Sequence, residues 1–241
     1  MDRYEKEAII YPTIIGTIIP VLLASAYFST LVPLATEWLV RLAAFVGIFI
    51  SINMVMDAIG YWFRELSAST SKYIIQYPLF KQDESQMPTT ELLLWNSHGN
   101  KSRSEIEAIA KKVKKDFNLL LLTQPQETAD PVEARKVVVD AVGKMREVTR
   151  DNETLQRYNR KFGFYRNLVG ASFYAIILVI VEMIVNSLYD MGFSSLLWLA
   201  FLLQLLLALF AIIFIKAKGY EYARALYNAY MTTDLKKGGI V

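Results

Sequence analysis

Two long apolar runs near the carboxyl terminus limit what this chain can fold into. The second, "LLWLAFLLQLLLALFAIIFI" (196–215), contains a single polar side chain, Gln204. Crossing the hydrocarbon core of a bilayer takes about 20 mostly apolar residues in a helix. The run therefore predicts a transmembrane helix.

Four segments meet this length requirement. The composition agrees, because 54% of the 241 residues are apolar while 20% are charged, a mixture that predicts membrane spans together with water-exposed protein. The first span contains Pro12 and Pro20, which membrane helices tolerate. The four predicted spans are roughly Ile9–Phe28, Leu39–Ile59, Leu168–Leu188 and Leu196–Ile215.

The positions of Lys and Arg predict the orientation of these spans. Of the 26 basic residues, 18 lie between Arg64 and Arg166, and the connections 29–38 and 187–195 contain none. Basic residues concentrate on the cytoplasmic side of a membrane. We therefore expect both termini and the middle segment in the cytoplasm of a bacterium, and two short outer turns across its inner membrane.

The middle segment has the capping signals of helices. Ser102 followed by Glu105 is a capping box, and Asp130 before Pro131 is an N-cap with proline at the first helical position. A further helix is expected to run from about Asn152 into the third span, and a short strand at 91–95. The fold class is thus an all-α membrane protein with four transmembrane helices as two hairpins. The predicted domains are a transmembrane hairpin (1–63), a mainly α-helical cytoplasmic domain (64–166), a second transmembrane hairpin (167–216) and a cytoplasmic C-terminal helix (217–241).

Several polar side chains fall inside or at the ends of the spans. A charged side chain within a span costs about 2.5–3.5 kcal/mol on insertion scales and usually faces protein or water. Glu182 could therefore line a pore between subunits, or only make a helix–helix hydrogen bond. The candidates for pore-lining or intramembrane polar residues are Glu182, Asn186, Gln204, Asn53 and Asp57.

The segment before the third span is rich in Arg and Asn. Its basic side chains could bind anionic lipid headgroups, or they could receive a phosphorylated ligand, because the Arg guanidinium fits phosphate oxygens. The candidates for ligand contact or gating are Arg150, Asp151, Asn159, Arg166 and Asn167.

Catalytic and metal-binding patterns are missing from the sequence. With one histidine, His98, and no cysteine, the chain offers no transition-metal ligand set. It also lacks a Gly-rich phosphate loop and a nucleophile elbow. We therefore expect no enzymatic activity and no cofactor, and the net charge of +3 gives no argument for binding double-stranded DNA.

Several motifs together resemble a family of uncharacterised bacterial four-helix membrane proteins from defence loci. The motifs are "DRYEKEAIIYPTIIGTIIPVLL", "PTTELLLW", "PQETADPVEARKVVVDAVGKMREVTRD", "NRKFGFYRNLVG" and "GYEYARALYNAY". The nearest comparison is the membrane component of Hailong-type anti-phage systems. The segment "SHGNKSRSEIEAIAKK" departs from the family pattern, which leaves ligand specificity there open.

This resemblance implies a function and partners. It implies an oligomeric ion channel controlled by a nucleotide or by an oligonucleotide that a partner nucleotidyltransferase makes. Because homo-oligomers are usually cyclic, we expect a tetramer with a central pore. One alternative is a non-conducting membrane scaffold that recruits a soluble enzyme. Another is a membrane-embedded enzyme that uses Glu182 or Asp57 on lipid or peptidoglycan precursors.

Overall fold

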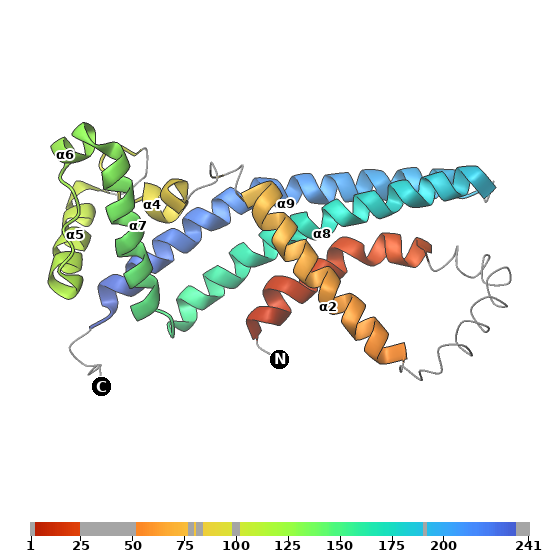
Figure 1. Cartoon of the computed structure of the whole chain (residues 1–241), viewed down its shortest axis with the longest axis horizontal. Coiled ribbons are helices and arrows are strands. Elements are labelled where there is room, and N and C mark those ends of the chain that lie inside the picture. Colours follow the sequence, from red (N-terminus) through yellow and green to blue (C-terminus); the bar gives the residue numbers. More distant parts are fainter. Residues whose placement is uncertain are drawn as a thin grey trace. The chain divides into compact units, whose positions relative to one another are not determined.

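The computed structural model describes residues 3–24, 52–76, 80, 84–97, 102–189 and 192–234. Throughout these residues the regular structure is helical, so the all-α class is confirmed. The helices form two compact units (Figure 1). Unit 1 comprises residues 1–75 and 164–212, and unit 2 comprises 76–163 and 213–241. The predicted domain boundaries concern the membrane faces and stay a prediction.

Unit 1 contains the helices that are long and apolar. An amino-terminal helix spans Glu5–Ala24 and opens with the π-helical stretch η1 (Glu5–Ile10). The next helix is α2 (Ile52–Thr70), which continues into the π-helical stretch η2 (Ser71–Gln76). Unit 1 also contains the greater part of α8 (Glu153–Tyr189) and half of α9 (Ser194–Thr232).

Three helices of the described part are long and apolar enough to cross a bilayer: the amino-terminal helix, α8 and α9. They indicate a multi-pass membrane protein. Residues 39–51 of the predicted second span, 39–59, lie outside the described part of the chain. The remainder of this span begins α2, which continues to Thr70, well past the predicted end of the span.

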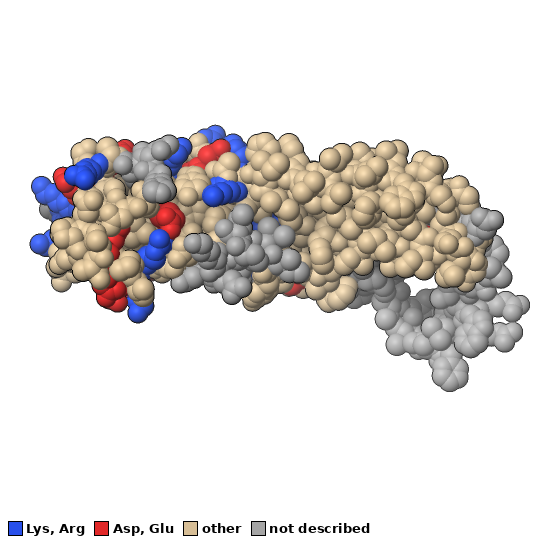
Figure 2. Space-filling model, turned by 90° about the horizontal axis from the view of Figure 1, so that it is seen from above, with Lys and Arg blue, Asp and Glu red and all other residues tan. Residues whose placement is uncertain are grey.

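The apolar parts of α8 and α9 lie side by side as a helical hairpin (Figure 1). Each helix buries one stripe and exposes large apolar side chains on its other faces, such as Ile184 on α8 and Ile213 on α9. No acidic or basic side chain is visible on the surface of the hairpin in Figure 2. The buried stripes are Leu168, Ala171, Ser172, Ala175, Val179, Glu182 and Asn186 on α8, and Leu197, Ala200, Gln204, Ala208, Ala211 and Ile215 on α9.

Unit 2 is built from short helices around the polar end of α9. Ser102 caps α5 with the predicted capping box to Glu105, and the Asp130 carboxylate accepts the Glu133 backbone N–H at the start of α7, so both predicted starts are confirmed. The described elements before α8 are η3 (Glu84–Gln86), α4 (Pro88–Glu91), α5 (Arg103–Phe117), α6 (Gln124–Ala129) and α7 (Pro131–Val148).

The predicted strand at 91–95 is wrong. Pro88 stands at the first position of a short helix, α4, where its missing N–H costs nothing, and the helix ends at Glu91 in a turn. The Glu127 carboxylate then accepts the backbone N–H groups of Trp95 and Asn96, each at 2.8 Å. These bonds satisfy donors that a strand would have paired with a neighbouring strand.

The core of unit 2 joins α5, α7, the start of α8 and the turn after α4 to α9. Its central side chains, including Ile109, Val113, Met145 and Leu226, are buried. Fully burying one such side chain stabilises the fold by about 1.5–3 kcal/mol. The core therefore fixes residues 220–230 of α9 within unit 2.

Both long helices run without a break from one unit into the other. The continuation of α8 from its polar start into the third span is confirmed. The sequence predicted a fourth span followed by a C-terminal helix, and in the structure both lie in α9, which is continuous over 39 residues. No proline interrupts it, and Gly219 allows a close approach, since a Cβ there would lie 3.2 Å from Pro88 Cγ.

Candidate functional site

Three of the predicted pore candidates, Glu182, Asn186 and Gln204, are buried polar residues of the hairpin. The Glu182 side chain is 5% exposed and Gln204 is fully buried, so both lie on the inner stripes of α8 and α9. Among the described residues, neither carboxylate oxygen of Glu182 and neither amide atom of Gln204 has a hydrogen-bond partner. Unpaired polar groups in an apolar surrounding are costly, by about 1–3 kcal/mol each.

The geometry of the hairpin explains why these two side chains do not bond each other. Asn186 Nδ2 donates to Ser194 Oγ at 3.0 Å, which fixes the register of the two helices. Glu182 lies about 6 Å before Asn186 along α8, and Gln204 lies about 15 Å beyond Ser194 along α9, at 1.5 Å per residue. They are therefore about 9 Å apart along the hairpin, too far for a hydrogen bond.

Asn186 has a local partner that the sequence did not reveal. Its Oδ1 accepts the backbone N–H of Phe193 at 3.0 Å, in addition to the bond from Nδ2 to Ser194. The residue thus closes the turn of the hairpin. The backbones of Asn53 and Asp57 lie in α2, and their side chains are outside the described part of the chain. The pore role of all five residues stays a prediction.

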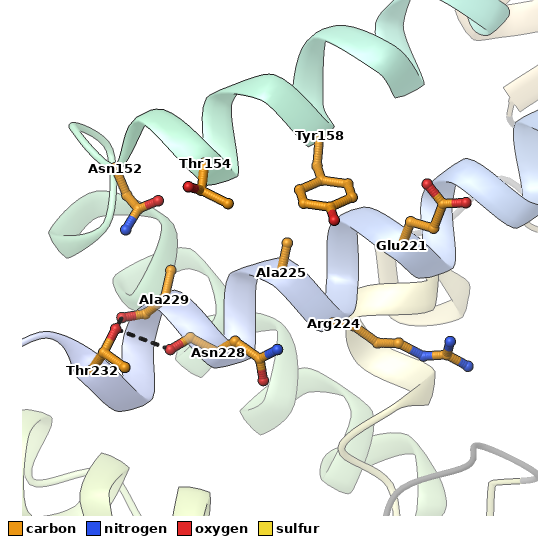
Figure 3. A pocket seen from close by; sticks show the side chains of 9 residues that line it. All are labelled: Asn152, Thr154, Tyr158, Glu221, Arg224, Ala225, Asn228, Ala229 and Thr232. Carbon is orange, nitrogen blue, oxygen red and sulfur yellow. Dashed lines mark hydrogen bonds between the residues drawn. The ribbon is translucent and has the colours of Figure 1, made fainter.

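Unit 2 contains a groove between the start of α8 and the end of α9, with a volume of about 510 Å³. Figure 3 shows Thr154 and Tyr158 projecting from α8 towards α9, where the small side chains of Ala225 and Ala229 leave room. This groove was not predicted from the sequence, although the four-residue spacing of Ala225 and Ala229, one helical turn, is a signal for close approach. The lining is completed by Asn152, Glu221, Arg224, Asn228 and Thr232.

Two cationic side chains lie close to the Tyr158 ring of this groove. Arg157 and Lys161 each lie 5.7 Å from the centre of the Tyr158 ring. Arg224 lines the groove from α9 and is exposed, whereas the acid nearby, Glu221, forms an ion pair with Lys218 at 2.6 Å. The groove therefore combines a ring, amide side chains and a guanidinium, groups that bind planar anionic molecules.

Two tyrosines anchor the polar end of α9 to the rest of unit 2. The Tyr227 hydroxyl donates to the Thr89 carbonyl oxygen, and the Tyr230 hydroxyl donates to Asp116 at 3.1 Å. Burial raises the pKa of both phenols, and Asp116 raises the pKa of Tyr230 further. Both hydroxyls therefore stay protonated donors at neutral pH.

The five predicted ligand or gate residues do not form one cluster. Arg150, Asp151 and Asn159 belong to unit 2, beside the groove in sequence but outside its lining. Arg166 and Asn167 belong to unit 1, where Arg166 Nε donates to Asn167 Oδ1 at 3.3 Å. Asn167 is buried, and its role in ligand contact stays a prediction.

The described part of the chain contains no group of three His, Cys, Asp or Glu side chains that could hold a metal ion. His98 lies outside the described residues. Comparison of the chain with protein families, with curated proteins and with solved structures finds no match. The resemblance to the defence-associated family therefore stays a prediction.

Proposed function

We propose that this chain is an oligomeric inner-membrane effector of bacterial anti-phage defence, a gated ion channel controlled by a nucleotide or oligonucleotide at its intracellular helical unit. The observation that carries the proposal is the continuity of α8 and α9. Each helix lines the groove of unit 2 at one end and forms the apolar hairpin at the other. A ligand that changes the spacing of the two helices in the groove would act directly on the membrane helices.

The proposal includes a topology and an assembly. Both termini and unit 2 face the cytoplasm, because the basic residues gather there. Four spans per subunit, including the segment 39–59, surround a central path in a cyclic homo-oligomer such as a tetramer. A partner nucleotidyltransferase supplies the ligand.

Conduction requires a second conformation of the hairpin. Glu182 and Gln204 are buried within a single chain, so they line a water-filled path only after α8 and α9 rotate or separate. Hydration in that conformation would satisfy the polar atoms that have no partner within the described residues. Two conformations with different polar surroundings are what a gate needs.

The test is ion flux from liposomes that contain the purified full chain, with and without nucleoside triphosphates or short oligonucleotides. We expect flux that one of these ligands changes by tenfold or more, and loss of the ligand response in Arg224→Ala. Arg103→Ala, which removes an exposed arginine on α5, is the matched control and keeps the response. Absence of flux under all conditions would favour the non-conducting scaffold instead.

A further inference from the structure

The amino-terminal helix contains a carbonyl group whose α-helical hydrogen-bond donor is missing. An α-helix pairs the carbonyl oxygen of residue i with the N–H of residue i+4, and the residue four positions after Ala8 is Pro12, which has no N–H. Ala8 itself lies in the π-helical stretch η1, whose last bond runs from the Tyr11 N–H to the Lys6 carbonyl oxygen. Pro12 comes next and, without an N–H, cannot extend this spacing. Ala8 is fully buried, so bulk water does not replace the lost donor.

The side chain of Asn167 supplies that donor from a position 159 residues away. Its Nδ2 donates to the Ala8 carbonyl oxygen at 2.5 Å. Its Oδ1 accepts from Ser71 Oγ at 3.2 Å and from Arg166 Nε at 3.3 Å. One buried amide thus connects three segments of unit 1: the amino-terminal helix, η2 and α8.

The packing next to this amide fixes the three segments closely. One turn along α8, a Cβ on Gly170 would overlap the carbonyl oxygen of Ser67 in α2. A Cβ on Gly16 of the amino-terminal helix would lie 2.7 Å from the Ala171 Cβ. Two glycines therefore permit the approach that brings Ala8 and Ser71 within reach of Asn167.

We propose that Asn167 is a positioning residue that replaces the hydrogen bond Pro12 removes, and thereby clamps the amino-terminal helix and η2 to α8. The clamp lies just beyond the point where α8 enters unit 1. A movement of α8 therefore reaches the amino-terminal helix through this amide. The role is intramolecular, and it does not depend on whether the protein conducts ions.

The absence of cysteine from the sequence allows a direct test. Ala8→Cys introduces a single thiol at the clamp, and its rate of alkylation by N-ethylmaleimide in the detergent-solubilised full chain reports how often the amino-terminal helix leaves α8. Asn167→Ala is expected to raise this rate about tenfold, the effect of one buried hydrogen-bonding group left unpaired. Adding Pro12→Ala restores a backbone donor for the Ala8 carbonyl, so the effect of Asn167→Ala should fall to threefold or less.

Ser71→Ala is the matched control, because it removes a bond to the same amide without touching the Ala8 carbonyl. Its effect on the alkylation rate should be the same with Pro12 and with Pro12→Ala. Equal effects of Asn167→Ala in both backgrounds would overturn the proposal. If a double variant fails to fold, Asn167→Leu gives the answer in the Pro12 background: it keeps a similar size and has no donor, so a rate as low as with Asn167 would also overturn the proposal.

Discussion

Glu127 and Glu182 are both buried carboxylates with 5% of their surface exposed, one in each unit, and their surroundings differ. Glu127 accepts two backbone N–H groups in unit 2. Glu182 has no hydrogen-bond partner among the described residues of unit 1, and neither do the side chains of Gln204, Ser67 and Ser172. Among the described residues of unit 2, Arg146 Nε is the buried side-chain atom that has no hydrogen-bond partner.

This difference indicates different tasks. A buried polar network that is fully bonded fixes one conformation, whereas unpaired buried groups lower the free energy needed to leave it. Unit 2 is therefore suited to hold the ends of α8 and α9 in a defined geometry. Unit 1 is suited to change its packing.

The largest contrast should come from the same substitution made in the two units. Gly170→Ala places a methyl group against the Ser67 carbonyl oxygen and is expected to destabilise the protein by about 3 kcal/mol. Gly143→Ala, in the middle of α7, meets no atom within 4 Å and should stabilise it by about 0.5–1 kcal/mol through helix propensity. Thermal unfolding in detergent measures both, and a loss of stability in both would contradict the close approach of α2 and α8.

Removal of the bonded carboxylate tests unit 2. Glu127→Ala leaves two backbone N–H groups without an acceptor and should destabilise the protein by about 2–3 kcal/mol. Glu147→Ala, at an exposed position of α7, should change stability by less than about 0.5 kcal/mol. Equal effects of the two substitutions would show that Glu127 does not hold the 95–96 backbone.

Replacement of the unpaired carboxylate tests unit 1. Glu182→Met keeps a side chain of similar length and removes two buried polar atoms that have no partner in the described part of the chain. We expect stability to rise by about 1–2 kcal/mol, because an apolar replacement removes a desolvation penalty. A decrease of similar size would mean that Glu182 is bonded to residues outside the described ranges, and the contrast with Glu127 would fail.

The smallest expected effect is a pH dependence of unit 2 in alkaline solution. The pKa values of Tyr227 and Tyr230 are raised above the ordinary value of 10.0, so the folded state keeps their protons when the unfolded state loses them. Their contribution is fully present below pH 10 and decreases as the pH rises above it. Tyrosinate absorbance should show two phenols that ionise only on unfolding, and ionisation of all tyrosines near pH 10 in the folded protein would contradict their burial.

The sequence predicted local features better than contacts between distant segments. The caps at Ser102 and Asp130 depend on residues within one turn, so their spacing is readable from the chain. The bond between Asn167 and the Ala8 carbonyl joins segments 159 positions apart, and only the fold brings them together. The groove was not predicted for the same reason. Its lining comes from the start of α8 and the end of α9, which lie far apart in the sequence.

The account depends most on unit 2 lying inside the cell while the turn of the hairpin lies outside. The chain has no cysteine, so Lys115→Cys on α5 and Ser195→Cys at the start of α9 each give one exposed thiol. A membrane-impermeant maleimide applied to intact spheroplasts is expected to label the thiol at position 195 at once, and the thiol at position 115 only after the membrane is permeabilised. Labelling of position 115 in sealed spheroplasts would contradict the account, because the groove would then face away from any cytoplasmic ligand.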